Sequence, residues 1–167
     1  MTAAVLALGA NLGDAKAALR GAVVALAQTP GIAVLDASPV FETDPVGGPD
    51  QPVYVNAIVL VDTSLEPYEL LARANAIEAE WHRTREVRWG PRTLDIDIID
   101  IDGFVSNDER LTIPHPRAHE RGFVLLPWLT VDPAAVIRGK AVVEYVREVD
   151  VAGVRMLEPR LDLVDNT

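Results

Sequence analysis

The stretch RWGPRTLDIDII, residues 88–99, ends in an alternation of aspartate with leucine and isoleucine that is typical of a half-buried β-strand. Successive side chains of a strand point to opposite faces, so Asp95 and Asp97 share one face and the apolar residues share the other. Two adjacent carboxylates repel each other unless a cation lies between them, and Mg²⁺ binds through one or two carboxylates plus substrate phosphates. A strand over 93–101 therefore predicts a metal site, with an ordinary solvated strand face as the alternative.

The segments before this strand predict the rest of the fold. Apolar runs bounded by glycine and proline indicate strands, and apolar residues at helical spacing indicate helices, one ending at Thr29-Pro30-Gly31 and one starting at Glu66-Pro67. The expected order is strand, helix, strand, strand, helix and strand, over residues 3–9, 13–28, 32–41, 53–63, 66–81 and 93–101. This β-α-β-β-α-β order predicts an α+β, ferredoxin-like fold, with an antiparallel sheet and two helices on one face.

The remaining segments predict a C-terminal elaboration of the same domain. Residues 111–129 indicate a loop and a short helix, and a terminal helix is expected near 141–148. We find no repeat, linker or low-complexity tract, so residues 1–167 are expected to form one domain. Residues 136–167 receive no role from the sequence.

Two other polar or glycine-rich features near these strands are excluded from the predicted site. Asp100 and Asp102 have the parity of Leu94, so a straight strand would place them away from the aspartate pair. Residues 9–13, GANLG, lie between a strand and a helix but lack the Lys-Ser/Thr ending of a phosphate loop. A tight strand-to-helix turn is the preferred explanation of these glycines.

Bulk composition limits the class of protein. With 167 residues, of which 49% are hydrophobic, the chain is large enough to bury a core that needs no disulfide or structural metal for stability. The absence of cysteine excludes disulfides and thiolate metal sites. The first residues lack a basic region, and no apolar stretch approaches 18 residues, so we expect a cytoplasmic protein without membrane contact. A net charge of -10 argues against a general nucleic-acid binder. We expect a monomer.

Arginine supplies the local positive charge that an anionic ligand needs. Seven arginines lie between positions 83 and 121, namely Arg83, Arg85, Arg88, Arg92, Arg110, Arg117 and Arg121. The rigid guanidinium fork of arginine binds phosphate oxygens in pairs. Together with the aspartate pair, this cluster predicts a phosphate-and-metal site.

Four segments together resemble the 6-hydroxymethyl-7,8-dihydropterin pyrophosphokinases of folate biosynthesis. They occur in the family's order and spacing, within a likeness that runs from residue 3 to residue 135: ALGANLGD (7–14), FETDPVGGPDQPVYVNA (41–57), RWGPRTLDIDII (88–99) and RLTIPHPRAHERGFVLLP (110–127). The resemblance implies a ferredoxin-like fold and transfer of pyrophosphate from MgATP to the hydroxymethyl oxygen of the pterin, with release of AMP. It also implies two Mg²⁺ ions held by Asp95 and Asp97.

The resemblance assigns further roles residue by residue. Arg83 and Arg92 resemble the catalytic arginines that contact the phosphates. Residues that resemble the ATP pocket are Asn75, Glu78, Arg85, Ile98, Arg110, Thr112, His115 and Arg121. Residues that resemble the pterin slot are Thr43, Asp44, Val46, Tyr54, Asn56, Trp89 and Phe123. A flat heterocycle favours aromatic faces, and an Asn amide offers both a donor and an acceptor to its edge.

Two alternatives remain beside the pyrophosphokinase. One is a non-catalytic ferredoxin-like module that binds a small molecule or RNA, although exposed aromatic residues on central strands and a basic face are not evident. The other is a phosphotransferase of the same fold that moves a single phosphoryl group. The nucleotide product, AMP or ADP or none, separates the three.

Overall fold

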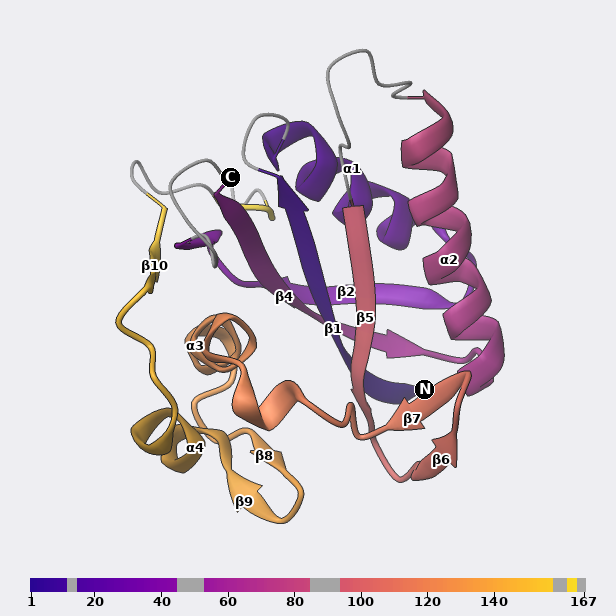
Figure 1. Ribbon diagram of the computed structural model, residues 1–167. Helices are drawn as coiled ribbons and strands as arrows, with labels where there is room; N and C mark the ends of the chain where they lie inside the picture. The colour runs from indigo at the N-terminus through magenta and orange to yellow at the C-terminus, as the bar shows by residue number, and fades with distance from the viewer. Residues whose placement is uncertain (12–14, 45–52, 85–93, 158–161, 165–167) are drawn as a thin grey trace.

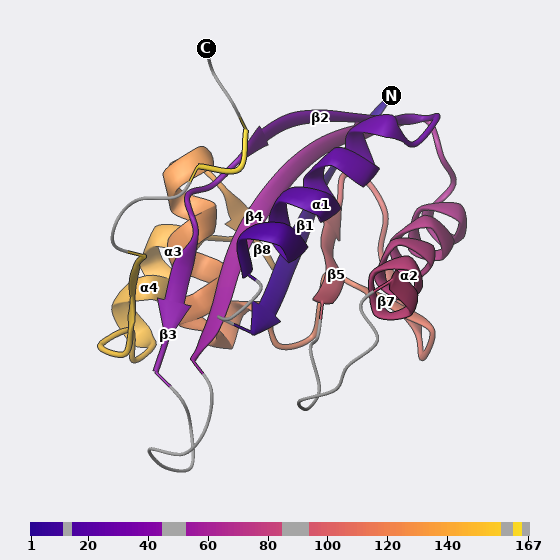
Figure 2. The same ribbon diagram turned by 90° about the horizontal axis from the view of Figure 1, so that it is seen from above.

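Three layers make up the molecule, with a β-sheet between two helical layers (Figure 1; Figure 2). The structure is a computed structural model that describes residues 1–11, 15–44, 53–84, 94–157 and 162–164. Helices α1 and α2 cover one face of the sheet, and α3 and α4 lie at the other face. The α+β, ferredoxin-like prediction is confirmed, and the helices expected within 111–129 and near 141–148 correspond to α3 and α4 of the second helical layer.

The elements follow the predicted order through the first hundred residues. They are β1 (Thr2–Asn11), α1 (Ala15–Gln28), β2 (Ile32–Ala37), β3 (Phe41–Thr43), β4 (Tyr54–Thr63), α2 (Pro67–Thr84) and β5 (Leu94–Ile101). The later elements are β6 (Ser106–Asp108), β7 (Leu111–Ile113), η2 (Ala118–Glu120), α3 (Gly122–Val131), β8 (Val136–Ile137), β9 (Lys140–Ala141), α4 (Val142–Glu148) and β10 (Val154–Met156).

The central sheet is antiparallel throughout. Its strands lie in the order β10-β3-β4-β1-β5, and β2 also pairs with β4. The core strands β4 and β1 lie in the middle of this sheet, and the core strand β5 forms one edge. The opposite edge is β10, which comes from the part of the chain that received no role from the sequence.

The expected single strand over 32–41 is wrong in one respect, because the chain divides there into β2 and β3. Pro39 lacks an N–H and cannot donate to a ladder. Beside it, the Ser38 N–H donates to the Ile58 carbonyl at 2.8 Å, and the Ser38 hydroxyl accepts from the Ile58 N–H at 2.9 Å. The two short strands consequently pair with different halves of β4.

The two helical layers bury separate apolar clusters against the sheet. Under α1 and α2, the helical stripes at Leu19, Leu26 and Leu70 pack on alternate residues of β1, β4 and β5. On the other face, Trp128 of α3 packs with Ile58 and neighbouring apolar residues. Alternate positions of each central strand therefore face different helical layers. Where α3 and α4 do not cover a strand, the positions on that face carry polar residues.

Helix α2 begins with a side-chain hydrogen bond at its first turn. Pro67 occupies the first helical position, and a carboxylate oxygen of Glu69 accepts from the Glu66 N–H at 3.3 Å. Among the helices of the described residues, none is long and apolar enough to cross a membrane.

Candidate active site

Asp95 and Asp97 lie on edge strand β5 with both side chains exposed. Leu94, Ile96 and Ile98 alternate with them and are buried under α1 and α2. The aspartates therefore project from the opposite face of the sheet, as the period of two predicts. Across β1, Asp95 pairs with Gly9 and Asp97 with Ala7.

A bulge in the same strand corrects the exclusion of Asp100 by parity. The register with β1 shifts, so that Leu6 faces Ile98 whereas Val5 faces Asp100. Ile99 is the extra residue of this bulge, so the residue after it points to the opposite face from the one that simple alternation predicts. Asp100 therefore lies on the face of Asp97, although three residues further along, and burial raises its pKa. Asp102 is exposed beyond the end of the strand.

Tyr54 reaches from β4 across β1 to the aspartate pair. Its hydroxyl donates a hydrogen bond to Oδ2 of Asp95. The ring passes over Gly9, where an added Cβ would lie 2.8 Å from Tyr54 Cε1 and 3.1 Å from Asn56 Nδ2. Gly9 lies inside β1, so the turn expected for this glycine is wrong. A glycine within a strand often marks such a close approach, and this signal could have been read from the sequence.

Asn56 lies one strand position further along the same face and is 7% exposed. Its Nδ2 donates to the Leu8 carbonyl at 3.5 Å, and its Oδ1 accepts from the Thr43 hydroxyl at 3.3 Å. An amide has two donor hydrogens and an acceptor with two lone pairs. Asn56 therefore keeps one donor and one acceptor for a ligand after these contacts.

Helix α2 protects the free edge of β5 with two side chains. Oε2 of Glu78 accepts from the Ile96 N–H at 2.9 Å, and Nε2 of His82 accepts from the Leu94 N–H at 3.4 Å. Burial raises the pKa of Glu78, the Ile96 hydrogen bond opposes the rise, and the charges of Asp95 and Asp97 add to it. The carboxylates of Glu78, Asp95 and Asp97 therefore raise the negative charge of this edge together, which favours a bound cation.

The ATP-pocket candidates on α2 and β5 lie around this edge. Asn75 is exposed one helical turn before Glu78. The Ile98 side chain is buried in the core, so the backbone of Ile98 is the part that can meet a ligand. Because the N–H groups of Leu94 and Ile96 point outward to α2, the alternation of the strand directs the backbone groups of Ile98 to the same edge.

His115 lies beside β5, where its N–H donates to the Ile99 carbonyl at 2.8 Å. Its Nδ1 accepts from the Arg117 N–H at 3.2 Å. Burial lowers the pKa of His115, the charge of Asp97 opposes this, and nearby arginines, Arg121 first, lower it further. Burial therefore favours the neutral form of this imidazole beside the aspartate pair.

Other candidates fall on either side of this centre. The guanidinium of Arg121 lies 5.6 Å from the Phe123 ring centroid at the start of α3. Arg110 lies 5.2 Å from the Tyr68 ring centroid, and the Thr112 hydroxyl donates to the Asp108 carbonyl. Tyr68 precedes Glu78 by ten residues, about 15 Å along α2. Arg110 and Thr112 therefore lie toward the first turn of that helix.

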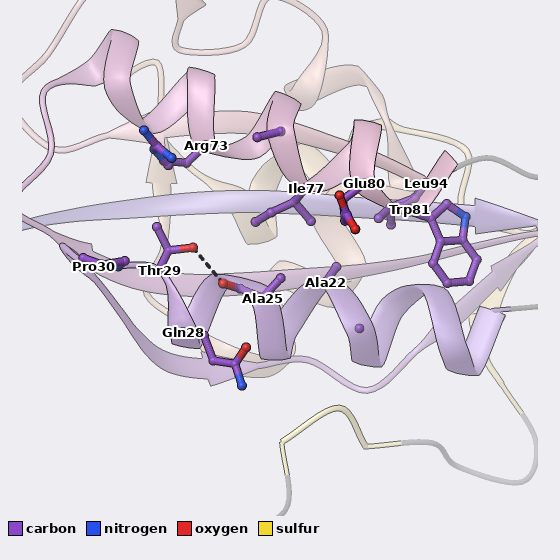
Figure 3. Close-up of a pocket in the computed structure, with 12 residues that line it drawn as sticks. Ala22, Ala25, Gln28, Thr29, Pro30, Arg73, Ile77, Glu80, Trp81 and Leu94 are labelled. Atoms are coloured by element: carbon purple, nitrogen blue, oxygen red, sulfur yellow. Dashed lines mark hydrogen bonds between the residues drawn. The ribbon is translucent and has the colours of Figure 1, made fainter. Parts of the chain in front are cut away.

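A pocket of about 400 Å³ lies between α1 and α2, on the other side of the sheet from the aspartates (Figure 3). Ala22, Ala25, Ile77 and Trp81 contribute apolar surface to it. Leu94 also lines it, and Leu94 points away from the face of Asp95. None of the predicted site residues lines this pocket, so the exposed face around Asp95 is the better candidate site.

Comparison with known proteins assigns the chain to a family. The model of the 7,8-dihydro-6-hydroxymethylpterin-pyrophosphokinase family matches residues 5–133, which include the strands and helices described above. The chain belongs to this family. A 2-amino-4-hydroxy-6-hydroxymethyldihydropteridine pyrophosphokinase of Methylorubrum extorquens is 46% identical over 158 residues, covering 95% of this chain and 100% of the relative. One from Bacillus subtilis is 49% identical over 124 residues, covering 74% of each.

Solved structures support the same fold at greater distance. A Plasmodium falciparum HPPK-DHPS chain aligns with a TM-score of 0.68 at 14% identity, over 88% of this pyrophosphokinase-family chain and 45% of the larger chain. This chain thus spans less than half of the fused proteins that it matches. At this identity the likeness carries the fold alone.

Several site candidates of this pyrophosphokinase-family chain lie outside the described residues. They are Val46, Arg85, Trp89 and Arg92. Arg83 belongs to the last turn of α2, but its side chain is not among those described. The structure therefore brings together Asp95, Asp97, Tyr54, Asn56 and Glu78 without testing the predicted arginine contacts.

Proposed function

We propose that the chain transfers a pyrophosphoryl group from MgATP to the hydroxymethyl oxygen of 6-hydroxymethyl-7,8-dihydropterin, giving AMP and the pterin diphosphate in folate biosynthesis. Membership of the pyrophosphokinase family over residues 5–133 carries this proposal. The geometry supports it, because the exposed carboxylate of Asp95 accepts a hydrogen bond from Tyr54, and the charges of Asp95 and Asp97 both act on Glu78. A nucleotide and a pterin can thus be bound on either side of one acidic centre.

The donor set fits a hard divalent cation. No cluster of three or more His, Asp and Glu ligands occurs within the described residues. In this proposal the two aspartates are the protein ligands, and phosphate and water fill the other positions. Mg²⁺ is bound in this manner, with few protein ligands and octahedral geometry. When bound, two such ions would neutralise the triphosphate and favour in-line attack on the β-phosphorus. We propose that Asp95 and Asp97 hold both.

The chain's own residues would prepare this centre. The Tyr54 hydroxyl holds Oδ2 of Asp95, which restricts the rotation of that carboxylate. Glu78 caps the Ile96 N–H between the two aspartates and so keeps β5 in place at the sheet edge. Both contacts reduce the reorganisation that ligand binding requires.

Pterin recognition is proposed for the face that contains Tyr54, Asn56 and Phe123. The remaining donor and acceptor of the Asn56 amide suit the polar edge of a pterin, while the aromatic rings suit its flat faces. By resemblance, Thr43, Asp44, Val46 and Trp89 complete this slot.

Phosphate recognition is proposed for the arginines. Because the chain carries a net charge of -10, a triphosphate needs local cations as well as metal. We assign Arg83 and Arg92 to the charge that develops on the transferred group. Arg85, Arg110, Thr112, Arg121, His115, Asn75 and the Ile98 backbone are assigned to the nucleotide.

A product assay tests the proposal. Wild-type protein is incubated with MgATP and 6-hydroxymethyl-7,8-dihydropterin, and nucleotides are separated by chromatography. AMP formed in proportion to pterin diphosphate is expected. ADP would instead indicate transfer of one phosphoryl group, and no turnover would leave a binding module. Omission of the pterin serves as the control for ATP hydrolysis.

We also propose that the chain works as a monomer with a single domain. The pairing of β10 with β3 supports one domain, because it joins the C-terminal segment to the central sheet. Light scattering after size-exclusion chromatography tests the monomer.

A further inference from the structure

The C-terminal strand β10 closes the sheet beside the β3 residues that resemble the pterin slot. Val154, Arg155 and Met156 pair antiparallel with Thr43, Glu42 and Phe41. The Leu157 N–H then donates to the Val40 carbonyl at 2.9 Å. A segment more than a hundred residues away in sequence therefore sets the outer border of β3.

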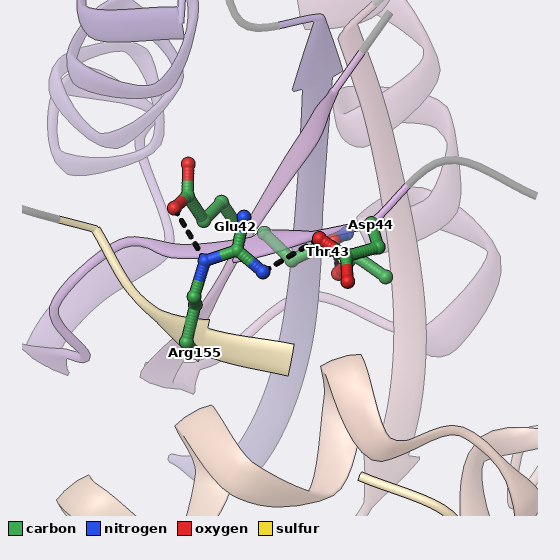
Figure 4. A network of polar contacts seen from close by, with 5 residues as sticks. Glu42, Thr43, Asp44 and Arg155 are labelled. Atoms are coloured by element: carbon green, nitrogen blue, oxygen red, sulfur yellow. Dashed lines mark hydrogen bonds and ion pairs between the residues drawn. The ribbon is translucent and has the colours of Figure 1, made fainter. Parts of the chain in front are cut away.

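Arg155 binds two carboxylates at the same time, one within β3 and one directly after it (Figure 4). Its Nε lies 2.7 Å from Oε1 of Glu42, and its Nη1 lies 2.6 Å from Oδ1 of Asp44. Glu42 and Asp44 are two residues apart and so share a face, where they would repel each other without a cation. The two carboxylates raise the pKa of Arg155.

Backbone contacts seat Asp44 against the same strand. The Asp44 N–H donates to the Gly153 carbonyl at 2.9 Å. A Cβ added at Gly153 would lie 3.3 Å from Oδ2 of Asp44, so the glycine leaves room for this carboxylate next to Arg155. Asp44 is thus held at its backbone and at its side chain by one three-residue segment.

The contacts continue from this clamp to the buried amide of Asn56. Thr43 lies between Glu42 and Asp44, and its hydroxyl donates to Oδ1 of Asn56 at 3.3 Å. On its other side, the segment leading into β10 reaches the start of α3, because a Cβ added at Gly122 would lie 2.9 Å from Cγ1 of Val151 and 3.5 Å from Cγ2 of Val154. Gly122 directly precedes Phe123. One C-terminal segment therefore contacts elements on both sides of the proposed pterin slot.

We infer that Arg155 is a positioning residue for the pterin site, which holds Thr43 and Asp44 against β4 so that the Asn56 amide is presented to the ligand. The inference rests on the proposed function. Arg155 is half exposed, at 49% of its side chain, Asp44 is 58% exposed and Glu42 is 18% exposed. Because Arg155 and Asp44 are open to solvent, the loss of Arg155 should act on ligand binding more than on stability.

Three variants test this role. Arg155→Met removes the charge and keeps most of the side-chain length, and Arg155→Lys keeps the charge but loses the fork that bridges two carboxylates. Arg147→Met is the matched control, since Arg147 is an exposed arginine of the nearby helix α4. Measurements are the KM for pterin, the KM for MgATP, kcat, the thermal midpoint and the Kd for pterin by equilibrium titration.

We expect Arg155→Met to raise the pterin KM and Kd about threefold to tenfold, the range of one or two exposed charge pairs. The KM for MgATP, kcat and the thermal midpoint should stay near wild type. Arg155→Lys should recover part of the pterin affinity, and Arg147→Met should match wild type throughout.

Two results would overturn the inference. One is an unchanged pterin KM and Kd in Arg155→Met; the other is a parallel loss of stability, kcat and both affinities, which indicates a general structural role. The proposed function fails separately, if wild type forms no AMP. Even then the pterin Kd of wild type and Arg155→Met still decides the role of Arg155, and a wild type that binds no pterin overturns both.

Discussion

The hydroxyl of Tyr54 donates a hydrogen bond to Oδ2 of Asp95 although strand β1 lies between their strands. The bond spans the sheet because Gly9 of β1 has no side chain under the Tyr54 ring. One residue of the proposed pterin slot therefore orients one of the proposed metal ligands. The two halves of the site are linked before either ligand binds.

Loss of this hydrogen bond should weaken metal binding. We expect Tyr54→Phe, which keeps the ring, to raise the Mg²⁺ concentration for half-maximal activity about tenfold, as for other residues that orient metal ligands. Activity measured over a Mg²⁺ series at fixed ATP checks this. Tyr68→Phe is the matched control, because the Tyr68 hydroxyl bonds to Asp108 near the start of α2. An equal shift in both variants would contradict the prediction.

A methyl group at Gly9 should disturb both Tyr54 and Asn56. The added Cβ of Gly9→Ala would lie 2.8 Å from the Tyr54 ring, so the variant should lose about 1–3 kcal/mol of unfolding free energy, as overpacking does. Turnover should fall with it. Gly21→Ala, in α1 with open space around it, should instead gain about 0.5–1 kcal/mol. Urea unfolding of both variants decides, and a stable Gly9→Ala would contradict the close approach.

Local periodicity predicted the strand that carries the site. The alternation around Asp95 and Asp97 depends only on the geometry of one strand, so the exposed faces of both residues follow from the sequence. The bulge that moves Asp100 to their face arises from the register with β1, which no pattern within residues 94–101 reveals. Simple alternation therefore predicts the correct face of the sheet for residues up to Ile98 and the wrong face for Asp100.

Long-range contacts explain what else the sequence did not reveal. The Arg155 clamp joins residues more than a hundred positions apart, and β10 is only three residues long. So short a strand has no recognisable period of its own and forms because β3 offers a free edge. The division at Ser38 and Pro39 was open to prediction, since proline inside a strand indicates an interruption.

The aspartate pair itself should be needed for turnover and not for folding. Asp95→Ala and Asp97→Ala should each lower kcat by about two orders of magnitude or more, because metal ligands supply several kcal/mol of charge stabilisation. Both side chains are exposed, so the thermal midpoint should stay close to wild type. Asp102→Ala, beyond the end of the strand, is the control. Near-normal activity of either pair variant with Mg²⁺ would refute the metal assignment.

Glu78 should make the metal-free protein less stable as pH rises. Burial, aided by Asp95 and Asp97, raises the pKa of Glu78 above its ordinary 4.5 in the folded state. The favourable protonated form is therefore present below pH 4.5 and is lost as pH rises through the folded pKa. Glu78→Gln keeps an acceptor for the Ile96 N–H, but its amide does not ionise as pH rises.

The unfolding free energy of Glu78→Gln should therefore exceed that of wild type by an amount that grows with pH over this window. Denaturant unfolding in the presence of a chelator measures the difference. A difference independent of pH for Glu78→Gln would contradict the assignment.

His115 should have the opposite dependence on pH, because burial lowers its pKa below the ordinary 6.5. As pH falls through 6.5, the unfolded chain takes up a proton that the folded chain refuses, so the unfolding free energy falls. His115→Asn should lose this slope, while His119→Asn should keep it. Titration of the His115 Cε1 proton by NMR gives the folded pKa directly. A folded pKa at or above 6.5 would mean that the charge of Asp97 outweighs burial, and it would contradict the prediction.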